Sequence, residues 1–164
     1  GTRKAKNISK SVQGHTKNLG LAEKTGFEYL REFRMDAGKI QKGDKISLDI
    51  LPAGEAGFSV GDKVQVSSVS KGRGFQGVVK RHGFHGGPRT HGQKHSEREA
   101  GSIGGGGRAG GRVVKGMRMA GRMGGDRVTV KNLKVVAIDS ATNTLLISGA
   151  VPGRKGTLVE IRSN

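Results

Sequence analysis

The feature that most constrains this chain is a stretch of 55 residues, 71–125, that combines glycine with positive charge. It holds 18 of the 30 glycines and carries 12 Lys and Arg against 2 Asp and Glu. Its apolar residues come in short pairs, such as Val78-Val79 and Val113-Val114, with no sustained period. Because such a segment buries little apolar surface, it cannot build a core of its own. We expect it to depend on the rest of the chain, or on a partner, for its order.

Positive charge dominates the chain but is unevenly spread. The 164 residues include 30 Lys and Arg against 13 Asp and Glu, a formal charge of +17, of which +10 lies in residues 71–125 and +5 in residues 1–34. At this net charge the positive side chains repel one another strongly, which favours a polyanionic partner. The sequence shows no long apolar run, no signal-peptide pattern and no basic amphipathic helix, so nucleic acid is favoured over a membrane. With no cysteine, disulfides and thiolate metal sites are excluded, which fits a reducing compartment.

The flanks of the glycine-rich stretch carry strand patterns. Residues 45–50 and 63–69 alternate between apolar and polar, and each follows a Gly-Asp turn signal, Gly43-Asp44 or Gly61-Asp62. Further strand patterns follow at residues 127–130, 133–138, 145–148 and 158–161, with turns at 140–143 and 152–153. Short strands at regular spacing predict a mainly β fold, and specifically a small antiparallel β-barrel.

These patterns divide the chain into three parts. Residues 1–34 form a basic leader, residues 35–70 and 126–164 form the barrel, and residues 71–125 are a long extension inserted between its strands. A structureless insertion of that length is unusual unless it is functional or becomes ordered on a partner. Within the leader, the spacing of Phe27, Leu30 and Phe33 indicates a helix, whereas alternation towards Met35 indicates a strand. We expect a helix followed by a strand.

The glycines Gly72, Gly74 and Gly77 match the G-x-G-x-x-G pattern of nucleotide-binding proteins. The dinucleotide version requires a helix directly after the glycines to hold a pyrophosphate. Because glycine and proline return within a few residues, we expect no such helix. The kinase version needs downstream catalytic residues that this short chain lacks. Nucleotide binding is therefore not predicted.

Four of the five histidines, His82, His85, His91 and His95, have spacings that could bind a metal. Glycine and proline between them leave nothing local to fix their geometry, and nearby cations such as Arg81 would repel a divalent ion. We predict no metal, no cofactor and no catalytic residue. Glu97 and Glu99 are expected to pair with Arg98 and Lys94 within the loop. A histidine-metal hydrolase or nuclease remains the alternative from another class.

The run of glycine and arginine at residues 101–112 could be a flexible linker, but it lies between strands of one predicted barrel. Glycine allows a close approach to a crowded phosphate surface, and arginine forms bidentate contacts with phosphate. Phe75 and Phe84 are the only aromatic residues of the extension. This argues against a stacking platform for single strands and favours a folded RNA recognised through its phosphates, 2′-hydroxyls and shape. No major-groove element for DNA is present.

Several blocks, in order, resemble the bacterial-type family of large-subunit ribosomal protein L three. They are Gly14-His15, Leu30–Arg34, Lys71–Phe84, Thr90–Gly92, Gly101–Gly104, Val114–Gly124, Asp126–Val130 and Gly149–Gly153. The resemblance implies a translation-protein-type β-barrel and an extension that runs through ribosomal RNA (rRNA) towards the peptidyl transferase centre. It also implies early binding during subunit assembly, neighbouring large-subunit proteins and a location in the ribosome, either cytoplasmic or organellar.

The chain departs from the family in two places. It starts at Gly1, after the N-terminal strands that usually complete the barrel, so we expect the barrel to be incomplete or closed by another route. The loop at Gly104–Gly111, the implied deepest point, has Arg108-Ala-Gly-Gly111 where relatives tend to have a Thr-Pro-Gly turn. A general RNA-binding chaperone is the second alternative.

The predicted rRNA contacts are the cations and histidines of the leader and the extension. They are Arg3, Lys4, Lys6, Lys10, His15, Lys17, Lys71, Arg73, Lys80, Arg81, His82, His85, Arg89, His91, Lys94, His95, Arg98, Arg108, Arg112, Lys115, Arg118 and Arg122.

Overall fold

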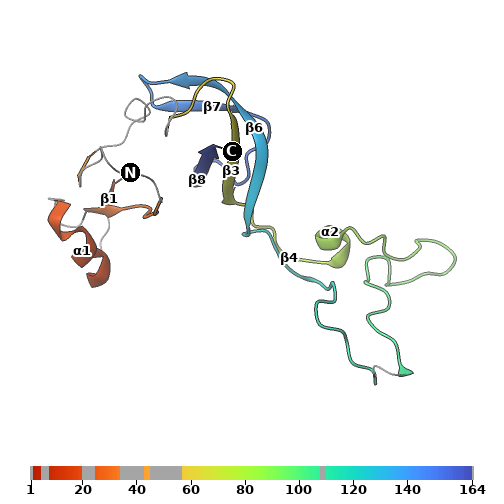
Figure 1. Ribbon diagram of the computed structural model, residues 1–164. Helices are drawn as coiled ribbons and strands as arrows, with labels where there is room; N and C mark the ends of the chain where they lie inside the picture. The colour runs from red at the N-terminus through yellow and green to blue at the C-terminus, as the bar shows by residue number, and fades with distance from the viewer. Residues whose placement is uncertain are drawn as a thin grey trace. The chain divides into compact units, whose positions relative to one another are not determined.

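The fold is mainly β, with antiparallel sheets and few helices (Figure 1). The computed structural model describes residues 2–4, 8–19, 25–33, 43–44, 57–107 and 110–163. The chain divides into two compact units, residues 1–50 and 51–164. Within the described residues, no helix is long and apolar enough to cross a membrane.

The first unit contains a short antiparallel pair and one helix. Strand β1 (Thr2–Lys4) pairs with β2 (Thr25–Phe27), and α1 (Lys10–Thr16) continues into a 3-10 turn, η1 (Lys17–Leu19). Gly26 is buried where a side chain would press on Ile8, at 3.1 Å from its Cδ1 atom. Residues 29–33 form neither a helix nor a strand, so the helix predicted there is wrong. The helix of the leader lies earlier, in α1.

The second unit is organised around a four-stranded antiparallel sheet. Its strands are β3 (Lys63–Val69), β6 (Arg127–Asp139), β7 (Thr144–Ser148) and β8 (Val159–Ser163), in the order β7-β6-β3-β8. The predicted strand 63–69 is confirmed, and so is the turn before it, where the Ser59 amide donates to the Asp62 carboxylate at 2.7 Å. The predicted strand at 45–50 lies outside the described residues. In the part of the chain that is described, the sheet is open, because β7 and β8 do not pair.

Strand β6 replaces two strands that the sequence predicts separately. The register shifts between the pairs Val64↔Leu133 and Val66↔Val130, and Asn132 at this point has a φ of 60°. Asparagine tolerates this left-handed conformation, so one extra residue forms a bulge and the strand continues. The prediction of a break at residues 131–132 was therefore wrong, and the same residues bend a single long strand.

The core of this sheet is small and lies on one face. Val64, Val66 and Val135 are buried, with Phe58 and apolar residues of β6, β7 and β8 packed around them. Alternation along β3 places Val64 and Val66 on this face and Ser67 on the other, where its hydroxyl shares a hydrogen bond with Thr129 at 2.7 Å.

The opposite face carries an ion pair. The guanidinium of Arg127 donates to both carboxylate oxygens of Glu160, with Nη1 to Oε1 at 3.1 Å. The hydrogen bond and the charge of Glu160 raise the pKa of the Arg127 guanidinium. The side chain of Glu160 is 9% exposed, so this carboxylate is held against the sheet by its partner.

Replacing Val66 by alanine should destabilise the second unit, because the side chain is 0% exposed and its removal leaves a cavity. We expect a decrease of about 2 kcal/mol in the free energy of unfolding, measured by urea denaturation of the full chain. Val136→Ala is the matched control, because Val136 is 49% exposed. It should change the stability by no more than about 0.5 kcal/mol. Equal effects of the two changes would contradict this location of the core.

Candidate nucleic-acid interface

The extension leaves the sheet along an outgoing leg, which starts at Ser70, and comes back along a returning leg, which includes Met119 and ends at Asp126. Hydrogen bonds join the two legs. The amide of Ser70 donates to the Asp126 carbonyl at 2.8 Å, and the amide of Arg73 donates to the Met123 carbonyl at 2.9 Å. Strands β4 (Gly74–Gln76) and β5 (Gly121–Met123) then pair in antiparallel register, with Phe75 opposite Arg122. The ladder between β3 and β6 therefore continues into the base of the extension (Figure 1).

Glycine is required where the two legs meet. A Cβ atom on Gly124 would lie 2.1 Å from the carbonyl oxygen of Lys71, and Gly124 has a φ of +76°. The close approach excludes any side chain unless the backbone shifts, and the positive φ adds strain for residues other than glycine. A Cβ atom on Gly121 would lie 2.6 Å from Nη1 of Arg81. Some glycines of the extension thus allow close packing within the protein itself.

A short helix follows β4. Helix α2 (Val78–His82) ends at Gly83, which has a φ of 74° and whose amide caps the helix. The expectation that no helix follows the glycines 72, 74 and 77 is therefore wrong, although this helix has only five residues. It forms because Val78 is buried, at 4% exposure, and because Gly83 adopts the left-handed conformation that ends a helix.

The last turn of α2 holds the two legs together. Arg81 Nη1 lies 2.7 Å from the Met119 carbonyl oxygen, to which it donates, and His82 Nε2 lies 3.0 Å from the same oxygen. The ring of His82 also lies 5.9 Å from that of Phe84, measured between centroids. Two predicted rRNA contacts, Arg81 and His82, therefore also bind the returning leg of the extension.

The loop after α2 folds back on itself. The amide of Gly87 donates to the Glu97 carbonyl at 3.0 Å, and a Cβ atom on Gly86 would lie 1.9 Å from that oxygen. The Glu97 carboxylate pairs with Arg89 at 3.4 Å, whereas the sequence suggested partners at Arg98 and Lys94. Both side chains of the pair are substantially exposed, so it contributes little stability.

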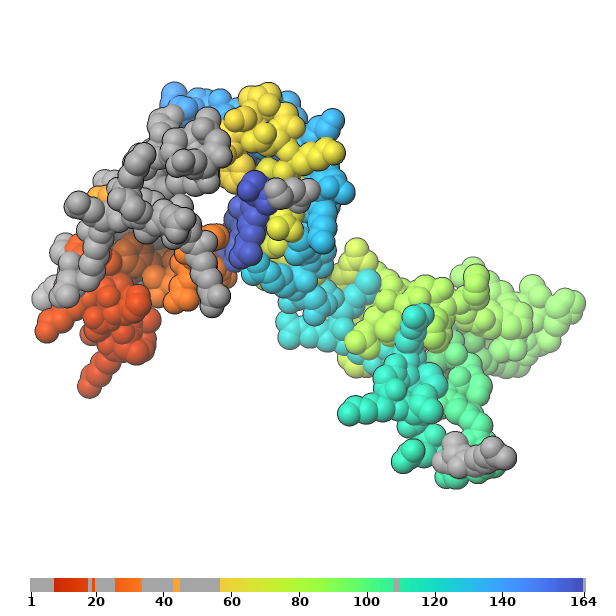
Figure 2. Space-filling view, in the orientation of Figure 1, coloured from red at the N-terminus to blue at the C-terminus, as the bar shows by residue number. Residues whose placement is uncertain are grey.

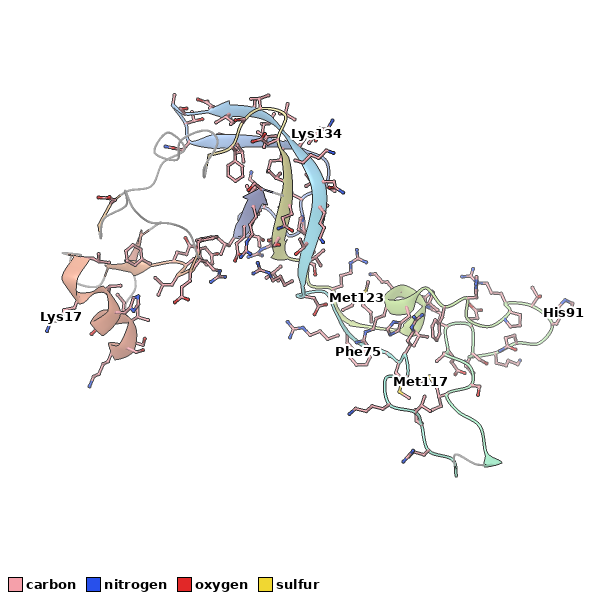
Figure 3. All side chains as sticks on the ribbon, in the orientation of Figure 1. Lys17, Phe75, His91, Met117, Met123 and Lys134 are labelled. Atoms are coloured by element: carbon pink, nitrogen blue, oxygen red, sulfur yellow. The ribbon has the colours of Figure 1, made fainter. Side chains whose placement is uncertain are left out.

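The histidines of this loop do not converge. His85, His91 and His95 are exposed, and His91, with a φ of 59°, lies at the far end of the loop (Figure 3). Among the residues that the structure describes, no group of three His, Cys, Asp or Glu side chains could hold a metal ion.

The outer part of the extension is thin (Figure 2). Its described residues include exposed cations. The exposed cations of the extension are Lys71, Arg73, Lys80, Arg89, Lys94, Arg98, Arg112, Lys115, Arg118 and Arg122. Near the tip, the Gly110 amide donates to the Gly107 carbonyl at 3.0 Å. With two carboxylates in the whole stretch, these cations present a positive surface to a polyanion.

Cations from both legs also gather around a hollow at the base of the extension. The hollow has a volume of about 580 Å³, and Lys71, Arg73 and Arg122 line it together with Pro152 and Gly153. Sequence reasoning missed this hollow, because the turn at Pro152-Gly153 carries no charge and lies far along the chain from β4. The only local signal was the turn pattern itself.

The predicted contacts in the first unit lie on three elements. Arg3 and Lys4 belong to β1, Lys10 and His15 to α1, and Lys17 to η1. The side chains of Lys10, His15 and Lys17 are exposed. Two further predicted contacts, Lys6 and Arg108, lie outside the described residues.

An antiparallel sheet with a long, cationic pair of legs that has few carboxylates is typical of proteins that bind polyanions. The sequence model of the family described as Ribosomal protein L3 matches residues 3–145. The "Large ribosomal subunit protein uL3" of Herpetosiphon aurantiacus is 48% identical over 162 residues, which cover 98% of this chain and 71% of that protein. The proteins of the same name from Chlorobium limicola and Deinococcus radiodurans are each 46% identical, covering 99% and 95% of this chain and 74% and 67% of those proteins. The chain belongs to the ribosomal protein L3 family, and it is not an enzyme.

Replacing Gly124 by alanine should open the base of the extension, because the new Cβ atom would overlap the Lys71 carbonyl at a positive φ. We expect the amide protons of β4 and β5 to exchange faster with solvent, measured by hydrogen exchange and NMR. Gly72→Ala is the control, because nothing lies within 4 Å of its added Cβ atom. A pairing of β4 with β5 that survives Gly124→Ala unchanged would contradict this close approach.

Proposed function

We propose that this chain is a structural constituent of the large ribosomal subunit that binds large-subunit rRNA of the 23S type and neighbouring ribosomal proteins. Membership of the ribosomal protein L3 family supports the proposal, as do relatives that are named large-subunit proteins. The observation that carries it is the row of exposed cations along the extension, with almost no carboxylate beside them. The protein would act in the cytoplasm, within the ribosome.

The mechanism that we propose is electrostatic and has two parts. Phosphates of the rRNA are neutralised by the exposed cations of the extension, and the counterions released drive binding. The base of the extension is held by the protein itself, through the β4–β5 ladder and the contacts of Arg81 and His82 with Met119. Only the outer loops then need RNA to become ordered.

We further propose the architecture that the family resemblance implies. Residues 35–70 and 126–164 would form a closed translation-protein-type barrel, residues 1–34 a basic leader, and residues 71–125 an extension that enters the RNA. The tip at residues 104–111 would approach the peptidyl transferase centre without contributing chemistry. Such a protein would bind early and support the assembly of the subunit. The antiparallel four-stranded sheet is compatible with part of such a barrel.

Protease sensitivity tests where RNA is needed. In the free protein we expect trypsin to cut residues 85–118, because the described residues of this part carry many exposed cations and belong to no α-helix or β-strand. In the assembled subunit the whole extension, residues 71–125, should be protected. Mass spectrometry of the fragments identifies the cut sites. Equal protection in the two states would contradict RNA-dependent ordering.

Salt dependence tests the binding of phosphates. Replacing Arg112, Arg118 and Arg122 by alanine should flatten the plot of log affinity against log salt, by roughly 0.7 to 0.9 for each phosphate that is no longer neutralised. The measurement is a filter-binding titration of the full chain with 23S-type rRNA at several salt concentrations.

The matched control removes three exposed cations from outside the extension instead, with alanine at Lys131 and Lys134 of β6 and at Arg154, which lies between β7 and β8. It lowers the net charge equally, so its salt slope should stay closer to that of the unaltered chain. Equal slopes for the two triple variants would show that total charge matters and not the extension. Equally tight binding to an unrelated RNA would favour the general chaperone.

A further inference from the structure

Phe75 is the most exposed large apolar side chain among the described residues, at 76%. It lies in the middle of β4, at the base of the extension (Figure 3). An aromatic ring that is left in water in the middle of a strand contributes little to the packing of this protein. Its exposure therefore needs an explanation outside the chain.

The local sequence leaves the ring uncovered. The positions two residues further along each leg, where side chains would share its face, include Gly77 and Gly124, which have no side chains to shield it. Met123 and Gln76 are offset by one residue from the Phe75↔Arg122 pair, so their side chains point to the opposite face of the ribbon. The residue that shares the face with Phe75 is Arg122, directly across the ladder.

The surroundings of the ring are cationic. Arg73 and Arg122 are both exposed, and among the residues that line the hollow beside them, which include Lys71 and Arg81, only Asp126 carries a carboxylate. An apolar protein surface laid over Phe75 would bury these guanidinium groups at a cost in desolvation. A nucleotide matches both features at once, because its base has an apolar face for the ring and its phosphate accepts from arginine.

We propose that Phe75 stacks on an unpaired base of the rRNA and that Arg122 binds a phosphate next to that base. The inference rests on the proposed function and assigns one nucleotide-binding site within it. A single ring agrees with the scarcity of aromatic residues in the extension. It provides one stacking contact on a folded RNA, where a platform for a single strand would need several.

The test is the affinity of the full chain for 23S-type rRNA at one fixed salt concentration. Phe75→Ala should weaken binding roughly 5- to 150-fold, which corresponds to about 1 to 3 kcal/mol for a stacked base. Phe75→Leu keeps an apolar side chain without a ring and should bind almost as weakly as the alanine variant, whereas Phe75→Trp should retain the affinity. The salt slope should stay unchanged in all three, because the cations that bind phosphate are all kept.

Three outcomes would overturn the proposal. They are unchanged affinity of the alanine variant, full affinity of the leucine variant, and a change in salt slope as large as that of Arg122→Ala. Because Phe75 is exposed, the variants should keep the β4–β5 pairing, which amide NMR verifies. Failure of the unaltered chain to bind rRNA would overturn the proposed function itself, and this inference with it.

Cross-linking identifies the class of the partner directly. A photoreactive benzoylphenylalanine at position 75, incorporated into reconstituted large subunits, should form an adduct with an rRNA nucleotide. The same probe at Val136, exposed on the sheet, is the control for indiscriminate labelling. An adduct formed chiefly with a neighbouring protein would overturn the stacking site and favour an apolar protein contact.

Discussion

The continuation of the β3–β6 ladder into the base of the extension is the constraint on which the rest of the structure depends. The hydrogen bonds at Ser70 and Arg73, and the close approach of Gly124 to the Lys71 carbonyl, hold both legs in one register. This register sets Phe75 opposite Arg122 and brings α2 within reach of Met119. A residue with a side chain at position 124 would disturb all of these contacts together.

The distribution of carboxylates separates the two roles of the cations. On the sheet, Glu160 binds Arg127 with both oxygens, so this arginine is a structural residue. In the extension, Glu97 makes only an exposed contact with Arg89, and most other cations face solvent. The same residue type therefore stabilises the fold in one place and presents charge in the other. A partner within the protein makes the difference, whether it is a carboxylate, as for Arg127, or a backbone carbonyl, as for Arg81.

The sequence predicted those parts of the structure that depend on local pattern. Strand 63–69 was found because its alternation matches its one-sided burial. Helix α2 was missed because five residues are too few to show a helical period, and its stability comes from Val78 and the Gly83 cap. The basic surface was predicted from charge alone. The contacts of Arg81 and His82 with Met119 were not, because they join residues 37 or 38 positions apart.

The doubled path of the chain through residues 71–125 has a topological consequence. Both legs are tied to the same sheet, so the extension has no free end and can enter a partner only tip first, with both legs side by side. An opening in the partner therefore has to accommodate two segments of backbone at once, and neither leg can advance without the other. Glycine, which has no side chain, keeps the width of such a doubled segment small.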